Sequence, residues 1–205
     1  MTKVISKLYP TYERAQQAVR DLEAAGVSSS DISIVSNNSD NWFSKNGSPK
    51  RVDGDGDGVD DRAEGAGAGA GIGATVGGAA GLLAGLGLLA IPGVGPVVAA
   101  GWLVATAAGA AAGGLTGGII GALTQAGVSE EDAHVYAEGV RRGGTLVTAR
   151  VDDRSAAQLE ATLERSALRT SDLRSIYGKS GWKTFDPAAK PYSADEVRRE
   201  RALYQ

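Results

Sequence analysis

The chain has 205 residues, a length typical of one domain or of one domain with a large insertion. It contains no cysteine and a single histidine, His134, which excludes disulfides, cysteine-ligated metals, thiol catalysis and multi-histidine metal sites. The 21 basic and 24 acidic residues nearly cancel, and aromatic residues make up only 5% of the chain, so the composition indicates no nucleic-acid partner.

The beginning of the chain predicts a strand–helix–strand unit within residues 1–37. A strand is expected over residues 3–9, followed by a helix whose apolar residues recur at spacings of three and four and which ends near Gly26. The alternating residues 31–35 predict the second strand. The first residues show no apolar core of a cleavable signal peptide, so we expect a location in the cytoplasm or on the cytoplasmic side of a membrane.

A polar, acidic linker is expected over residues 38–64, and it ends in the run DGDGDGVDDRAE. This run fits D-x-D-x-D-G-x5-E, the spacing at which oxygen atoms on a tight loop converge on one Ca²⁺. The predicted ligands are Asp53, Asp55, Asp57, Val59 (through its carbonyl), Asp61 and Glu64. No clear helix enters the loop and no second loop pairs with it, so a solvated linker between two packed parts remains the alternative.

An uncharged, glycine-rich tract occupies residues 65–127. The stretch 65–129 has no charged residue and no histidine, and 20 of the 30 glycines lie between Gly65 and Gly127. Glycines recur every four residues on both sides of a Pro-Gly-Val-Gly-Pro turn, which predicts two α-helices packed as a glycine-zipper hairpin. The glycines expected to drive self-association are Gly69, Gly73, Gly77, Gly81, Gly109, Gly113, Gly117 and Gly121.

The turn of this hairpin, residues 91–96, carries no polar side chain, so we expect it to be buried. The turn would lie either in a membrane, into which the hairpin dips from one side, or in the core of an oligomer. Each arm is long enough to cross about 30 Å of hydrocarbon. A flexible Gly/Ala linker is the alternative that the regular period disfavours. Basic residues would flank the base of an inserted hairpin on the cytoplasmic side. They are Lys50, Arg51, Arg62, Arg141 and Arg142.

Residues 128–177 predict a helix and a second strand–helix–strand unit. The first helix is expected to begin after Ser129, and a strand follows over residues 144–151. Ser155 and Gln158 form an expected capping box for a helix that continues to about Ala167. A second strand is expected over residues 171–177. Residues 178–205 read as a flexible tail, with a short helix from Ser193.

Two strand–helix–strand units predict an α+β fold, a ferredoxin-like split βαβ sandwich interrupted by the glycine-zipper hairpin. His134 lies near three glutamates at helical spacing, but such a histidine usually packs on a helix surface. The GxG strings of the glycine tract do not complete a dinucleotide motif. We therefore predict that the protein is not an enzyme and has no catalytic residue, and that Ca²⁺ is its only candidate cofactor. The aromatic run at residues 182–186 either docks on the sandwich or a neighbour, or stays disordered.

The segment AGVSSSDISIVSNN in the first unit resembles the bacterial general stress protein family typified by heat-induced stress protein YflT. The run GLLAGLGLLAIPGVGPVVAAGW, followed by GVSEEDAHVYAEGVRRGGTLVTARV, is similar to the long glycine-rich version of that family. The resemblance covers about residues 3–37 and 65–151. It implies a small stress-response protein without a recognised catalytic site, and it does not account for the acidic loop.

These features predict a non-enzymatic, self-associating stress-response protein whose hairpin inserts into a membrane or an oligomer core. The alternative is a Ca²⁺-responsive binding module in which the loop at residues 53–64 controls hairpin exposure or assembly. The expected partner is a second copy of the chain, with membrane lipid as an alternative and no nucleic acid.

Overall fold

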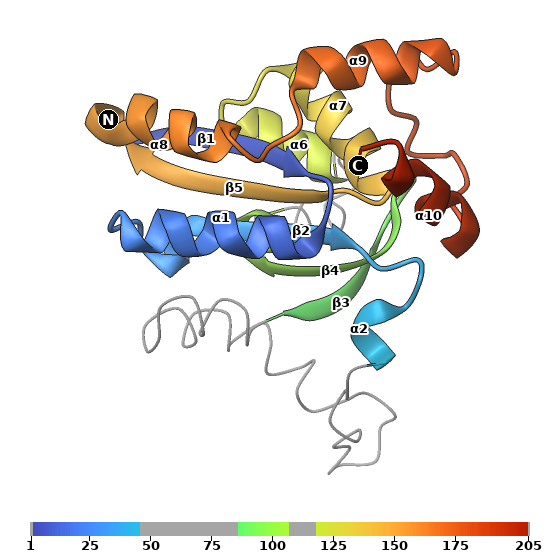
Figure 1. Cartoon of the computed structure of the whole chain (residues 1–205), viewed down its shortest axis with the longest axis horizontal. Helices are drawn as coiled ribbons and strands as arrows, with labels where there is room; N and C mark the ends of the chain where they lie inside the picture. The colour runs from blue at the N-terminus through green and yellow to red at the C-terminus, as the bar shows by residue number, and fades with distance from the viewer. Residues whose placement is uncertain (1, 46–85, 107–117, 205) are drawn as a thin grey trace.

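The computed structural model describes residues 2–45, 86–106 and 118–204, which form a five-stranded antiparallel sheet with helices on both faces (Figure 1). The order of the strands in the sheet is β1-β5-β2-β4-β3. Because β5 is antiparallel to both β1 and β2, the strand–helix–strand unit predicted at the beginning of the chain is split by β5. The strands are β1 (Thr2–Tyr9), β2 (Ile32–Asn37), β3 (Gly87–Ile91), β4 (Gly95–Gly101) and β5 (Thr145–Asp152).

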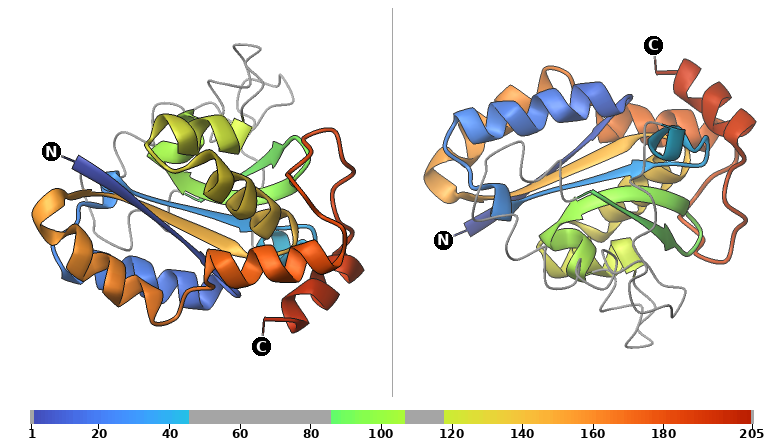
Figure 2. Two further views of the ribbon diagram at one scale, coloured as in Figure 1. Left: turned by 90° about the horizontal axis from the view of Figure 1, so that it is seen from above. Right: turned by 90° about the horizontal axis from the view of Figure 1, so that it is seen from below.

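The helices form two layers on either side of this sheet. Figure 2 shows α1 (Tyr12–Ala24) and α8 (Asp153–Glu164) along one face. The opposite face is covered by α6 (Gly118–Gln125), α7 (Glu130–Arg141) and α9 (Thr170–Lys179). The short α2 (Trp42–Lys45) and α10 (Ala194–Ala202) lie at one end of the molecule.

Each face of the sheet has its own apolar core. On β2, Ile32 and Ile34 pack with the buried residues of α1 and α8, whereas Val35 packs with those of α7 and α9. All six residues of β2 are buried. Burial of such a side chain contributes about 1.5–3 kcal/mol, so this central strand stabilises both layers at once.

The predicted boundaries of three helices agree with their caps. Ser129 Oγ accepts a hydrogen bond from the backbone of Asp132 at the start of α7. Ser193 and Glu196 form a complete capping box at the start of α10. At the start of α1, Thr11 Oγ1 accepts a hydrogen bond from the backbone N–H of Arg14. The capping box expected at Ser155 is wrong, because α8 starts two residues earlier and Ser155 Oγ donates to the backbone carbonyl of Asp152.

The strand predicted over residues 171–177 is also wrong, since this segment lies within α9. Leu173 and Tyr177 are four residues apart and both are buried, so helix formation places both on the side packed against α7. The second predicted unit is therefore strand–helix–helix. It supplies only β5 to the sheet, so the ferredoxin-like arrangement of two complete βαβ units is not formed.

The helical hairpin is wrong over residues 87–101, which form β3, a turn and β4. Gly93 in the turn has φ 73°, a conformation that glycine adopts without strain. Five residues of β4 pair with β2, from Ser33 opposite Gly101 to Asn37 opposite Val97. A helix here would leave that edge of the buried strand β2 without backbone partners, at a large cost in free energy. Most other residues of the predicted hairpin lie outside the described ranges.

Candidate functional site

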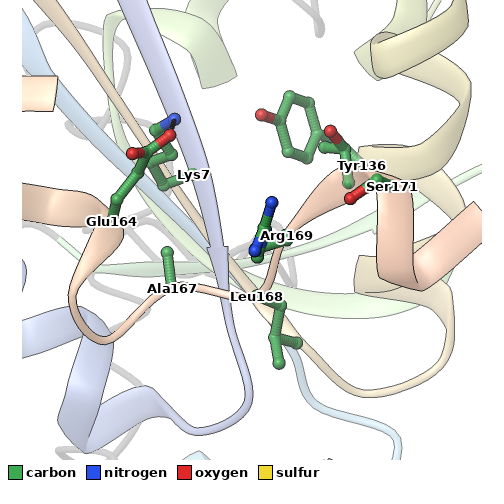
Figure 3. A pocket seen from close by; sticks show the side chains of 8 residues that line it. Lys7, Tyr136, Glu164, Ala167, Leu168, Arg169 and Ser171 are labelled. Atoms are coloured by element: carbon green, nitrogen blue, oxygen red, sulfur yellow. Dashed lines mark hydrogen bonds and ion pairs between the residues drawn. The ribbon is translucent and has the colours of Figure 1, made fainter. Parts of the chain in front are cut away.

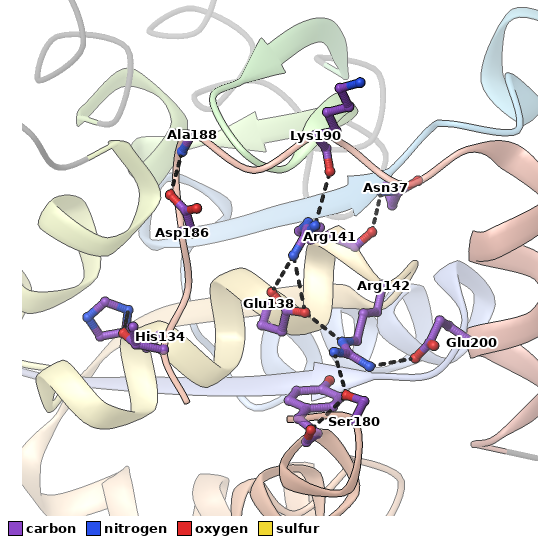
Figure 4. A network of polar contacts seen from close by, with 12 residues as sticks. Asn37, His134, Glu138, Arg141, Arg142, Ser180, Asp186, Ala188, Lys190 and Glu200 are labelled. Atoms are coloured by element: carbon purple, nitrogen blue, oxygen red, sulfur yellow. Dashed lines mark hydrogen bonds and ion pairs between the residues drawn. The ribbon is translucent and has the colours of Figure 1, made fainter. Parts of the chain in front are cut away.

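A buried carboxylate near the end of α7 helps to hold the C-terminal segment, which we define as residues 180–204. Glu138 is 0% exposed and accepts a hydrogen bond of 2.6 Å from Arg142 Nε. Arg142 Nη1 lies 3.0 Å from Glu200 Oε2 on α10, and its Nη2 donates to Ser180 Oγ at 3.2 Å (Figure 4). One arginine on the sheet-bound part of the protein thus contacts both the start and the end of the segment.

The surroundings of Arg142 keep its guanidinium charged. Burial alone would lower the pKa of Arg142, but the hydrogen bond and the negative charge of Glu138 raise it above its ordinary value. The guanidinium carbon also lies 4.4 Å from the ring centre of Tyr177, where a cation is attracted to the aromatic face. Arg142 therefore acts as a fixed positive charge and not as a proton donor in catalysis.

Arg141 holds the middle of the C-terminal segment. Its Nη1 lies 3.2 Å from Glu138 Oε2, and its Nη2 donates to the carbonyl of Lys190 at 3.0 Å. The prediction that Arg141 and Arg142 flank the base of a membrane-inserted hairpin is wrong, because both are largely buried and paired within the protein. The other three basic residues of that prediction, Lys50, Arg51 and Arg62, lie outside the described residues.

A second attachment point lies on α10. Arg201 Nε donates to the carbonyl of Gly143 at 2.8 Å, and its Nη1 lies 2.7 Å from Asp40 Oδ2. Val197, on the same helix, is fully buried. The prediction of a flexible tail over residues 178–205 is thus corrected, because its described part buries apolar side chains and forms ion pairs with the rest of the fold.

The C-terminal segment also covers the turn between β3 and β4. A Cβ atom built on Gly93 would lie 2.7 Å from the backbone oxygen of Asp186 and 2.9 Å from Phe185 Cζ. Val94 is completely buried, and Phe185 packs in the same core. The middle of the turn, Gly93 to Gly95, is therefore buried, as the sequence indicated, whereas Pro92 and Pro96 are exposed. The middle is covered by residues of the same chain.

Hollows on the described surface include two that are lined by charged side chains. The first, of about 220 Å³, lies near the ends of β1 and α8 and the start of α9 (Figure 3). Arg169 and Ser171 line it together with Lys7, whose Nζ lies 3.1 Å from Glu160 Oε1 and 2.9 Å from Glu164 Oε1. Burial alone would raise the pKa of the Glu160 carboxyl. The hydrogen bond and the positive charge of Lys7 outweigh this effect and hold the pKa below its usual value. The charge of Lys7 is thus already balanced by two carboxylates.

The second hollow, of about 410 Å³, contains the only histidine of the chain. His134 Nδ1 lies 3.0 Å from Thr184 Oγ1, and its Nε2 lies 3.9 Å from Glu130 Oε1. The order hydroxyl–imidazole–carboxylate is that of a hydrolase triad, but the carboxylate is too far for a hydrogen bond and its side chain is 82% exposed. The arrangement instead fastens Thr184 of the C-terminal segment to α7.

The structure tests few of the predicted site residues. The loop at residues 53–64 lies outside the described ranges, so Ca²⁺ binding stays a prediction; the described residues contain no acidic or histidine cluster that could hold a metal. Of the predicted self-association glycines, only Gly121 is described, on α6. A Cβ atom built there would have no heavy atom within 4 Å. Among the described helices, none has the length and apolar character to cross a membrane.

The outer hairpin of the sheet, formed by β3 and β4, exposes an apolar side chain that the sequence did not predict. Leu88 on β3 is 53% exposed, and β3 is the last strand of the sheet. Sequence reasoning missed it because the run around Leu88 is apolar throughout, so no periodicity separates exposed from buried positions. The buried ion pair was more accessible to prediction, since Glu138 and Arg142 are spaced four residues apart on a helix.

Comparison with known proteins adds evidence for the first part of the chain. No curated protein and no solved structure matches it. A family of stress proteins does match the β1–α1–β2 unit and α2, and this match supports a general role in stress response. Residues 4–45 match the model of the heat induced stress protein YflT domain, which confirms for this part of the chain the family that its residues resemble.

Proposed function

We infer that this chain is a non-enzymatic stress-response protein that acts by self-association, and that the uncharged part of the insertion between β2 and α7, residues 65–129, supplies the contact. The match to a stress-protein domain supports the cellular role. The single observation that carries the association is the placement of β3, which brings an uncharged and partly exposed strand to the edge of the sheet.

The described parts of the insertion support an interface made of apolar surface. Residues 86–106 and 118–128 carry no charged side chain, yet Leu88 is half exposed and Ile120 is only partly buried. Contiguous apolar surface on a soluble domain usually marks a place where another molecule binds. On α6, the open space beside Gly121 would also admit a helix of a second copy, because glycine permits close backbone approach.

We expect no catalysis at the charged groups of the described residues, because other contacts occupy them. Glu138 and Arg142 hold the C-terminal segment, and Lys7 is balanced by two carboxylates. In the second hollow, the imidazole of His134 has a hydroxyl neighbour but no hydrogen-bonded carboxylate. An enzyme site needs a nucleophile or general base held in place by a further group.

The covered turn between β3 and β4 favours association of folded molecules over insertion of that turn into a membrane. Insertion would require residues 185–191 to leave Gly93, Val94 and Gly95, whose space they fill. It would also separate the contact between Arg141 and the Lys190 carbonyl. Contact between two outer hairpins requires neither change.

Size-exclusion chromatography with light scattering over a range of protein concentrations tests the proposal. We expect a mass above that of the 20.8 kDa chain, and dissociation on dilution. Gly121→Leu should weaken association if the open face of α6 takes part. Gly178→Leu is the matched control, because Gly178 is also a helical glycine with no heavy atom near a built Cβ, but it lies on α9 outside the insertion.

A wild-type protein that stays monomeric at every concentration would contradict self-association. Flotation with vesicles of mixed neutral and anionic lipid separates the membrane alternative. Leu88 and Leu203, the latter just after α10, are both exposed apolar residues. Vesicle binding that is lost on substitution of Leu88 but not of Leu203 would mean that the apolar insertion binds lipid and not a second copy.

A further inference from the structure

The outer edge of β3 is unprotected within the described part of the chain. One side of β3 pairs with β4 from Gly87 to Ile91, and no described strand pairs with the other side. The strand GLLAI contains no charged residue and no proline, and both Leu88 and Ala90 are exposed. Native sheets usually protect such edges with charges, proline, bulges or a covering element, because unpaired N–H and C=O groups bind other strands.

The opposite edge of the sheet is protected in two ways. The backbone N–H of Leu168 donates to the carbonyl of Leu8 at 2.7 Å, which bridges the end of β1. Two charged side chains, Lys3 and Lys7, lie along the rest of that strand and form ion pairs with Glu160 and Glu164 of α8. A β3 strand from a second copy would therefore meet charged side chains and a bridged end at β1, so the β1 edge is less suited than the β3 edge to pair with it.

We propose that β3 of one copy pairs antiparallel with β3 of a second copy about a two-fold axis, so that the two sheets join into one. This inference rests on the proposed self-association and names its contact. A two-fold contact uses the same patch on both copies and closes at a dimer. If Leu89 lies on the axis, Leu88 of each copy lies opposite Ala90 of the other.

This register makes a charge test possible. In Leu88→Lys/Ala90→Lys, two lysines of one copy would face two lysines of the other, and like charges directly opposite each other destabilise a strand pair. In Leu88→Lys/Ala90→Glu, each lysine would face a glutamate of the other copy. We expect the first double variant to raise the dissociation constant of the dimer by about tenfold or more, and the second to restore most of the wild-type value.

The control is Leu203→Lys. Leu203 is the other exposed large apolar residue of the described chain, at 61%, but it lies just after α10 and away from the sheet edge. It should leave the dissociation constant unchanged. Far-ultraviolet circular dichroism and thermal unfolding of each variant show whether the monomer is folded, and this is expected because both substituted positions on β3 are exposed.

The outcomes separate the two proposals. A wild-type protein that associates equally well in both double variants would overturn β3 pairing and leave self-association standing, through another surface such as α6. Equal weakening in both double variants would place β3 in the contact but overturn the two-fold register. A wild-type protein that is monomeric throughout would overturn both proposals.

Discussion

Glu138 shows how one residue can hold a segment that is distant in sequence. Its carboxylate is fully buried and accepts hydrogen bonds from Arg141 and Arg142. Those arginines contact residues of the C-terminal segment, among them Lys190 and Glu200. Transfer of these charges out of water is costly, so the cluster is stable only while each charge keeps its partners.

Replacing Glu138 with glutamine should therefore strongly destabilise the fold. The amide keeps the shape of the side chain but leaves the buried Arg142 guanidinium without its closest negative charge. Breaking a buried pair by removing one partner typically costs about 3–5 kcal/mol in the free energy of unfolding. Urea denaturation followed by tryptophan fluorescence measures this, since Trp182 lies against Tyr177, which stacks on Arg142.

Glu131→Gln is the control for this variant. Glu131 pairs with Arg174 at 2.8 Å, but its side chain is 80% exposed. Exposed pairs contribute about 0–1 kcal/mol, so this change should be nearly neutral. Equal effects of the two substitutions would mean that the Glu138 cluster contributes no more than a surface ion pair.

At the scale of elements, the turn between β3 and β4 and the C-terminal segment depend on each other. The segment crosses the turn where Gly93 and Gly95 leave room for it, and Pro191 lies where a Cβ on Gly95 would be. Segment 180–193 forms no regular helix or strand, so its order depends on such contacts and on the ion pairs of Arg141 and Arg142.

Gly93→Ala should loosen the C-terminal segment. The new methyl group would collide with the backbone of Asp186 and Pro187, each 2.7 Å away, and these atoms cannot rotate aside. Limited trypsin digestion should then cleave faster after Lys183, an exposed residue of the segment. Lys190 is not a trypsin site because Pro191 follows it. Mass spectrometry of the early products identifies the cleaved bonds.

Gly26→Ala separates this collision from simple backbone strain. Gly26 also has a positive φ, 90°, but a Cβ atom there has no heavy atom within 4 Å. Both variants carry the strain of a non-glycine residue in the left-handed region, at about 1–2 kcal/mol. Cleavage of the C-terminal segment should rise only in Gly93→Ala. An equal rise in Gly26→Ala would show that global destabilisation, and not displacement of the segment, opens the site after Lys183.

At the scale of the whole molecule, the tyrosines indicate how the fold responds to alkali. All six tyrosines have a raised pKa, and burial is the first cause in each. Burial raises the pKa of Tyr204 to about 12, in spite of its hydrogen bond to Tyr177. The folded state thus holds its phenolic protons more tightly than the unfolded chain, in which tyrosine ionises near pH 10.

Stability should therefore fall as the pH rises above about 10. Below that pH, tyrosines are protonated in both states and contribute no pH dependence. Above it, the unfolded state binds fewer protons than the folded state, so the free energy of unfolding decreases until the folded tyrosines also ionise. Tyrosinate absorbance should appear together with the loss of circular dichroism. Full ionisation near pH 10 in a protein that remains folded would contradict the burial of these rings.

Much of the local structure was predictable from the sequence. The helix after Thr11 and the helices that start at Ser129 and Ser193 follow from apolar spacing and from side chains that cap the first turn. The burial of Val94 in the middle of the turn follows from the lack of polar side chains there. These features depend on residues a few positions apart in the chain, so a single sequence contains the information.

Only the tertiary structure decided what the apolar segment 87–101 becomes and what covers it. A run with apolar residues at every position satisfies helix and strand periodicity equally, and the choice follows from β2, whose free edge needs backbone partners. Likewise, residues 171–177 form a helix because this places Leu173 and Tyr177 on one face, where both pack against α7. The covering of the turn by residues 185–191, and the burial of Glu138, depend on contacts between segments about 50 to 100 residues apart, and local patterns carry no record of such contacts.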